Sequence, residues 1–262
     1  MSEEGIIATE TLFEPTPRNP VLVCGLPGSG YVGKLAAEHL ISVFNGRRFK
    51  EYHSPSFPPQ ANVGNDGIVH QVRGEYYFAE TDQGKDLLIF TADAQPTTSQ
   101  GEYRLSELVV QEGRRLGAKL VVSLAAYITG NFSDEQRVFG ASSSTDVSKT
   151  LSENGVKIMK EGAITGMNGL VIAMASLDGL DSFCLLGETS GYMVDPAASQ
   201  RVLEALARIL GMKIDLSTLN ERVVEAKELM EQIQKMSATQ AAGAEAGPPG
   251  QGASRRQPGY IG

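Results

Sequence analysis

Residues 20–41 read PVLVCGLPGSGYVGKLAAEHLI, and this stretch indicates the class of fold. The apolar run at residues 20–24 is bounded by proline and glycine, which predicts a buried strand. A glycine-rich turn follows, and residues 31–44 then carry the apolar spacing of a helix. A strand, a turn and a helix in this order are typical of an α/β domain.

The segments that follow repeat this alternation of strand and helix. Residues 68–72 and 76–80 alternate in polarity around Arg73-Gly74 and predict a β-hairpin. Further buried strands are predicted at residues 86–91, 119–126 and 183–186, and helices at residues 102–116, 146–154, 169–177 and 196–210. We therefore expect an α/β fold with a mostly parallel sheet that is flanked by helices.

The C-terminal region is expected to have two parts. Residues 216–236 carry apolar side chains at spacings of three and four, a heptad pattern that fits either a helix packed on its own domain or a contact between subunits. Residues 238–262 are rich in glycine, proline and alanine, and we expect a disordered tail because little apolar area is available to offset chain entropy. The predicted organisation is one domain over residues 1–237 and a tail over residues 238–262.

Composition narrows the class of protein. The net charge is −8, and since the tail carries +1, the body carries −9, which argues against non-specific nucleic-acid binding. The sequence has no run of about 18 apolar residues and no basic, apolar start, so we expect neither a membrane span nor a signal peptide. Cys24 and Cys184 lie in apolar runs and are expected to be buried thiols. These features favour a cytoplasmic protein.

The glycine turn matches a ligand-binding spacing. Gly28, Gly30 and Gly33 form a G-x-G-x-x-G pattern between a predicted strand and helix, which is the context of a dinucleotide-binding loop. Lys34 brings the segment close to a phosphate-binding P-loop, but Leu35 stands where a hydroxyl side chain would hold Mg²⁺.

A dinucleotide site also needs an acidic residue about twenty positions further on, at the end of a second strand. Glu51 has roughly that spacing, but a proline-rich run follows it and makes a poor second βα unit. We therefore favour a tight strand-to-helix turn in which the glycines allow close packing. A nucleotide- or phosphate-binding enzyme that uses residues 28–34 remains the alternative.

Other polar residues follow predicted strand ends, where α/β proteins place ligands: Asp93, Gln95, Asn168 and residues 188–192. Asp93 and Glu188 would form a carboxylate pair only if the fold brought them together. No pattern combines a nucleophile with a base, and His39, His53 and His70 have no metal-ligand spacing. We expect no catalytic residues, no metal and no cofactor.

Four segments together resemble the proteasome assembly chaperone family in its archaeal form. They are residues 25–41, 91–105, 162–175 and 185–206, and the similarity spans most of residues 6–220 in family order. The resemblance implies an α/β domain of phosphorylase/hydrolase-like architecture without established catalysis. It also implies a homo-oligomeric chaperone that binds 20S proteasome α subunits or the assembled core particle.

The resemblance extends to the chain terminus. Some members of the family carry a C-terminal motif of a hydrophobic residue, tyrosine and any residue, which inserts into pockets between α subunits. Here Tyr260, Ile261 and Gly262 would form the docking segment. The sequence departs from the motif by one position, because the tyrosine is third from the end and follows Gly259, and Ile261 is in the penultimate position.

Overall fold

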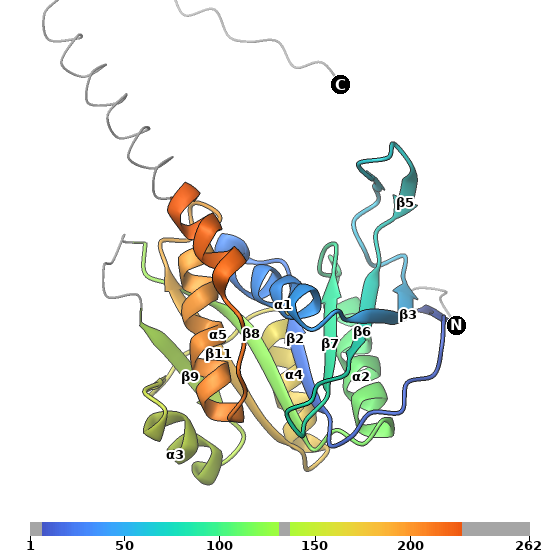
Figure 1. The fold of residues 1–262 in the computed structure, drawn as a ribbon. Helices are drawn as coiled ribbons and strands as arrows, with labels where there is room; N and C mark the ends of the chain where they lie inside the picture. Colours follow the sequence, from blue (N-terminus) through green and yellow to red (C-terminus); the bar gives the residue numbers. More distant parts are fainter. Residues whose placement is uncertain (1–6, 131–136, 227–262) are drawn as a thin grey trace, which may run out of the picture. The chain divides into compact units, whose positions relative to one another are not determined.

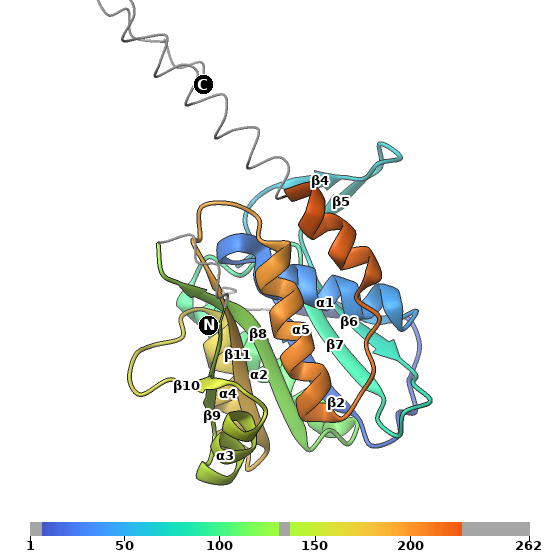
Figure 2. The same ribbon diagram turned by 60° about the vertical axis from the view of Figure 1, so that its left-hand side comes forward.

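The structure, a computed structural model, describes residues 7–130 and 137–226. Contacts divide the chain into two units, residues 1–223 and 224–262, and the fold described below is that of the first. Its elements form three layers, with one large sheet between two layers of helices (Figures 1 and 2).

The central layer is a nine-stranded sheet with the order β1-β3-β6-β7-β2-β8-β11-β9-β10. Its strands are β1 (Ala8–Thr11), β2 (Val21–Gly25), β3 (Arg47–His53), β6 (Gly74–Ala79), β7 (Leu87–Ala92), β8 (Leu120–Ile128), β9 (Val138–Ser142), β10 (Lys157–Ile158) and β11 (Asp181–Thr189). Strands β7, β2, β8 and β11 are parallel to one another, as are β9 and β10. The other neighbours pair antiparallel, so the sheet is mixed around a parallel centre.

Helices cover both faces of this sheet (Figure 1). They are α1 (Val32–Val43), which the short turn η1 (Ser29–Tyr31) precedes, α2 (Ser99–Arg115), α3 (Thr145–Glu153), α4 (Met167–Leu177) and α5 (Pro196–Leu210). In β2, Leu22 and Cys24 belong to the core beneath α2 and α4, while Val21 and Val23 belong to the core beneath α1 and α5. A strand that is buried on both faces has a continuous run of apolar residues in its sequence. The apolar run at residues 20–24 therefore predicted β2 correctly.

The predicted α/β class is confirmed, but the predicted hairpin is wrong. β5 (Val69–Gln71) pairs with β4 (Ala61–Val63) in a separate two-stranded sheet, whereas β6 pairs with β3 and β7. Tyr76 of β6 is fully buried, with ring centroids 5.1 Å from Phe49 and 5.4 Å from Phe90. Burial of this aromatic cluster outweighs the pairing of sequence neighbours, because each ring removes a large apolar area from water.

The predictions for the two cysteines and for the first part of the heptad pattern fall on residues that the structure describes. Cys24 and Cys184 are buried free thiols, as predicted, and burial raises the pKa of both. Residues 217–226 are helical, and Leu219 is 1% exposed in the core beneath α1 and α5, which supports packing of this part of the heptad pattern on its own domain. Residues 227–262, including the predicted tail and docking segment, lie outside the described residues. Among the described helices, none has the length and apolarity needed to cross a membrane.

Candidate functional site

The candidate site lies where the parallel strands β2, β8 and β11 end. In parallel sheets, the loops that follow the carboxyl ends of neighbouring strands meet at one edge, and ligands bind there. The glycine turn follows β2, and Gln95 lies shortly after β7. The segment that leads into α4 and residues 190–195, which follow β11, complete this edge. We call it the strand-end edge.

The glycines of the turn have different packing roles. A Cβ on Gly33 would lie 2.0 Å from the carbonyl oxygen of Leu124, so only glycine lets α1 approach β8 this closely. Gly30 has a φ of 62°, in the left-handed region that glycine adopts at little cost. Gly28 is extended, and no atom lies within 4 Å of a Cβ built there. The close approach that we favoured for this turn is therefore present at Gly33.

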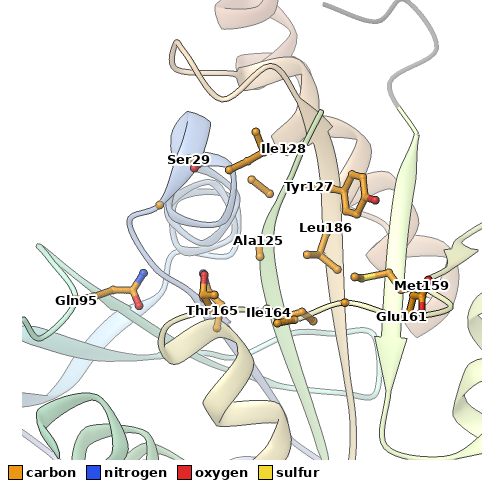
Figure 3. A pocket seen from close by; sticks show the side chains of 15 residues that line it. Ser29, Gln95, Ala125, Tyr127, Ile128, Met159, Glu161, Ile164, Thr165 and Leu186 are labelled. Carbon is orange, nitrogen blue, oxygen red and sulfur yellow. The ribbon is translucent and has the colours of Figure 1, made fainter. Parts of the chain in front are cut away.

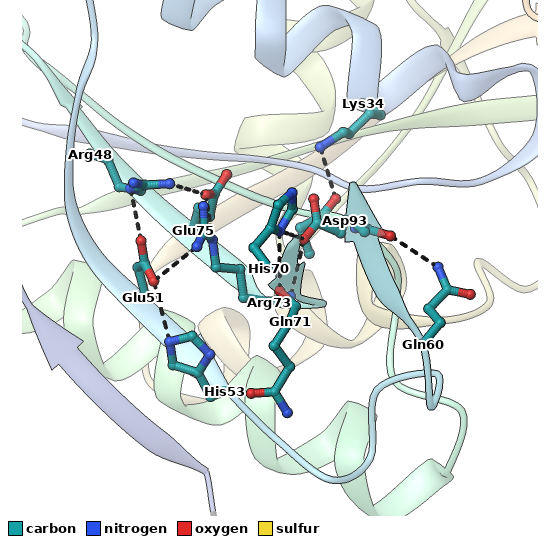
Figure 4. A network of polar contacts seen from close by, with 12 residues as sticks. Lys34, Arg48, Glu51, His53, Gln60, His70, Gln71, Arg73, Glu75 and Asp93 are labelled. Atoms are coloured by element: carbon teal, nitrogen blue, oxygen red, sulfur yellow. Dashed lines mark hydrogen bonds and ion pairs between the residues drawn. The ribbon is translucent and has the colours of Figure 1, made fainter. Parts of the chain in front are cut away.

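Lys34 is directed toward the end of β7 (Figure 4). Its Nζ donates a hydrogen bond to the carbonyl oxygen of Ala92 at 2.9 Å and lies 3.3 Å from Glu38 Oε1. The lysine thus links α1 to the neighbouring strand. A ligand role for Gly28, Gly30, Gly33 and Lys34 stays a prediction.

A carboxylate lies beside the same turn. The backbone N–H of Asp195 donates to the Gly30 carbonyl oxygen at 2.8 Å, and Thr189 Oγ1 donates to Asp195 Oδ2 at 2.7 Å. Asp195 Oδ1 accepts from the Ala198 N–H at 2.9 Å and so caps α5. A negative charge next to the glycine turn opposes the approach of a phosphate group.

A cavity of about 450 Å³ opens between the glycine turn and the start of α4 (Figure 3). Its apolar walls come from β8, β11 and the segment before α4, through Ala125, Leu186, Met159 and Ile164. Its polar lining residues include Ser29, Gln95, Glu161, Thr165 and Asn168. This size and mixture of surfaces are those of small-molecule pockets.

Gln95 and Asn168, which the sequence placed after strand ends, both line this cavity. Gln95 Nε2 donates to the Pro27 carbonyl oxygen at 2.6 Å, and Gln95 Oε1 accepts from the Met167 N–H at 2.9 Å. Gln95 therefore joins the glycine turn to the first turn of α4. Asn168 is 6% exposed, and its Oδ1 accepts a long hydrogen bond of 3.4 Å from Ser123 Oγ.

The fold does not bring Asp93 and Glu188 together as a carboxylate pair, because β2 and β8 lie between β7 and β11 in the sheet. Each carboxylate has other partners. Asp93 Oδ2 accepts from the backbone N–H of Arg73 at 3.2 Å. Glu188 is 3% exposed and forms two hydrogen bonds of 2.8 Å with the guanidinium of Arg137, which lowers its pKa.

A second polar group, the β3–β6 ion-pair network, lies on the same edge of the sheet, beside the end of β7 (Figure 4). Arg48 and Arg73 both contact Glu75, and Arg48 Nε lies 3.0 Å from Glu51 Oε1. Burial raises the pKa of Glu75, but hydrogen bonds from the two arginines outweigh this effect and hold it below its usual value. Side-chain oxygen and nitrogen atoms of Glu10, Glu51 and His53 lie within 4.8 Å of one another. Arg48 and Arg73 compete with a cation for Glu51, so we interpret the network as structural.

Sequence reasoning missed this network because β3 was not predicted. Glu51 belongs to β3, which β6 and β7 separate from β2, so it is not placed to serve the glycine turn. A bulge between Arg48 and Lys50 interrupts the register of β3 with β6 and breaks the two-residue alternation. The apolar pair Phe49 and Tyr52, both buried, was the available signal.

Comparisons with known proteins agree with this fold. Among solved structures, PbaB of Pyrococcus furiosus, described as an archaeal proteasome activator, is 31% identical, with a TM-score of 0.81 over 87% of this chain and 98% of that one. PbaA of the same organism, described as an archaeal homolog of proteasome-assembly chaperone, is 29% identical, with a TM-score of 0.73 over 90% and 94%.

A sequence relative and a family model extend this likeness. The uncharacterized protein MJ1210 of Methanocaldococcus jannaschii is 34% identical over 88% of this chain and 89% of its own length. The PAC2 family model matches residues 22–237. The expected resemblance is confirmed, and the chain belongs to the PAC2 family.

Proposed function

We propose that this protein is a proteasome assembly chaperone-like protein that binds 20S proteasome α subunits or the assembled core particle in the cytoplasm. The observation that carries the proposal is the likeness to PbaB and PbaA, each of which matches along nearly its whole length. We propose binding and not catalysis as its activity. Polar groups of the strand-end edge support this, because Glu188, Asp195 and Lys34 are each held in hydrogen bonds within the fold.

The proposed contact has two parts, of which the first is the C-terminal tail. Tyr260 and Ile261 would enter a pocket between α subunits, and the carboxylate of Gly262 would pair with a lysine there. One tail binds weakly because it must become ordered. A homo-oligomer presents several tails, each with a reach of roughly 25 Å over about 20 residues, and so gains avidity.

The second part is a surface of the folded body. Exposed apolar side chains gather on the strand-end edge at Tyr31, Ile128, Tyr192 and Val194, which we call the apolar rim. The rim is continuous across its loops, since a Cβ on Gly191 would lie 3.1 Å from Ile128 Cγ2 and the Asp195 N–H bonds to Gly30. Exposed apolar patches of this kind mark contact surfaces on soluble proteins.

The tail is tested by measuring binding to purified 20S core particles and to free α subunits. We expect deletion of residues 260–262 and the substitution Tyr260→Ala to weaken binding at least about tenfold, with an unchanged melting temperature. Gln257→Ala, a nearby tail substitution, is the matched control and should bind like the unchanged protein. Equal binding after the deletion would discard the tail mechanism and leave a body-only contact.

The body surface is tested in the same assay with Tyr192→Ser and Val194→Ser combined. We expect weaker binding, because both side chains belong to the apolar rim that would contact the partner. Both are exposed, so the substitutions should leave the core intact. Leu177→Ser is the control, since Leu177 is 88% exposed at the far end of α4. If neither core particles nor α subunits bind the full chain, the proposed function itself fails.

A further inference from the structure

An amide side chain whose donor is not used within the described part of the fold lines the cavity at the strand-end edge. Asn168 lines the cavity with 6% exposure, and its one hydrogen bond among the described residues is the long contact from Ser123 Oγ to Oδ1. Its Nδ2 therefore has no acceptor within the described part of the fold. Solvent reaches this donor, because Nδ2 is not among the fully buried unpaired atoms, so a ligand in the cavity that offers an acceptor atom can replace the water there.

The position of Asn168 adds to this indication. It is the second residue of α4, whose N-cap, Gly166, offers no side-chain cap. The positive end of the helix dipole thus adjoins the cavity and favours an acceptor atom on the ligand. Gln95 holds this helix start in place through its bond to the Met167 N–H.

The lining limits the chemistry of the ligand. Ala125, Leu186 and Ile164 supply apolar walls suited to the face of a ring. Among the described residues that line the cavity, Glu161 supplies the one carboxylate, and none is lysine or arginine. An anionic ligand would find no cationic side chain among these residues to compensate its charge, whereas a neutral ligand needs none. A cavity of about 450 Å³ also exceeds the roughly 30 Å³ that a single water occupies.

We propose that this cavity binds an uncharged small molecule of nucleobase or nucleoside size that carries a planar amide-type edge. Asn168 Nδ2 donates to an acceptor atom of that edge, and Asn168 Oδ1 accepts from a neighbouring N–H, the pairing by which a primary amide reads such an edge. The ring of the ligand lies against the apolar walls. This site uses the cavity and not a phosphate grip by the glycine turn, and it is independent of proteasome binding.

The test is calorimetric titration of the full chain with uracil, uridine, adenosine and uridine 5′-monophosphate. We expect at least one of the three uncharged probes to bind, and the monophosphate to bind about tenfold more weakly than uridine. Asn168→Ala should weaken binding of that probe about tenfold or more, the loss expected for a buried hydrogen bond. Asn62→Ala, which removes an amide from β4 instead, should leave the affinity unchanged.

A second variant guards against a folding defect in Asn168→Ala. Ala125→Leu fills the cavity with a larger apolar side chain, so it should abolish binding while melting at or above the temperature of the unchanged protein. The proposal is overturned if no uncharged probe binds, or if Asn168→Ala and Ala125→Leu both bind as well as the unchanged chain. It is also overturned if uridine binds and the monophosphate binds as tightly or more tightly, which would assign the ligand to the glycine turn.

Discussion

Glu188 shows how a single buried residue ties stability to pH. Its carboxylate is 3% exposed and accepts from Arg137 Nε, Nη2 and the Arg137 backbone N–H, at 2.8, 2.8 and 3.1 Å. The hydrogen bonds from Arg137 lower the pKa of Glu188 in the folded state. As pH falls, the Glu188 carboxylate therefore binds a proton in the unfolded chain before it does so in the folded protein. The stabilisation by this ion pair is complete above the unfolded pKa of about 4.3 and is lost progressively as pH falls below it.

We predict that Glu188→Gln lowers the free energy of unfolding by about 1–3 kcal/mol at pH 7, because it removes the charge of a buried carboxylate that accepts hydrogen bonds from the half-exposed Arg137. The deficit should shrink as pH falls from 5 toward 3, since the unchanged protein loses the same interaction there. Urea unfolding at several pH values measures this. Glu107→Gln is the control, because the Glu107–Arg104 pair is about half exposed on both sides and should contribute less than about 1 kcal/mol. A deficit that stays constant with pH would contradict the assignment to this ion pair.

At the scale of elements, the contact between α1 and β8 depends on a missing side chain. Glycine inside a helix costs about 1 kcal/mol relative to alanine, so propensity alone favours alanine at position 33. Steric overlap has the opposite effect on stability and disfavours alanine, because the new Cβ would lie 2.0 Å from a backbone oxygen that cannot rotate away. Overpacking of this kind costs about 1–3 kcal/mol, and here the overlap with backbone is severe.

We predict that Gly33→Ala destabilises the protein by about 2 kcal/mol or more in chemical denaturation. Gly28→Ala, five residues earlier in open space, should change stability by less than about 0.5 kcal/mol. The two variants differ in position alone, so the comparison isolates the helix–strand contact. A neutral or stabilising Gly33→Ala would mean that α1 can move outward at little cost.

The elements also show what the sequence could and could not predict. β2 and β7 are buried along their whole length, and β8 is buried over residues 121–125. Such apolar runs can be recognised in the sequence without a structure. β3 was not predicted because a bulge and its charged residues obscure the alternation of polar and apolar side chains. β10 was not predicted because it has two residues, too few to show a pattern. The pairing of β6 with β3 and β7 depends on Phe49, Tyr76 and Phe90 meeting across the sheet, which is a long-range effect.

The candidate site was also predictable only in part. Gln95 and Asn168 followed strand ends in the sequence, and the parallel centre of the sheet does place them in one cavity. The wall formed by residues 159–165 was not predicted, because it is irregular chain with no periodic pattern. Arg137 was missed as the partner of Glu188, since the two are 51 positions apart.

For the molecule as a whole, we predict an ordered pattern of amide hydrogen exchange. Protection should be highest in β2, β7 and β11, whose residues are almost all buried, and lowest in the β4–β5 hairpin, whose residues are exposed or half-buried. Mass spectrometry of the exchanging full chain measures this. Equal protection in the hairpin and in β2 would show that the hairpin is covered in solution.

The hairpin has a practical consequence of its own. It forms a sheet separate from the nine strands, and its turn contains Gly67, around which no atom lies within 4 Å of an added Cβ (Figure 2). Extra chain spliced in at this point would be displayed without entering the interior, and each doubling of loop length costs only about 0.6 kcal/mol. Position 67 is thus a suitable place to graft a fluorophore or affinity tag, which would leave the proposed docking segment at residues 260–262 unmodified.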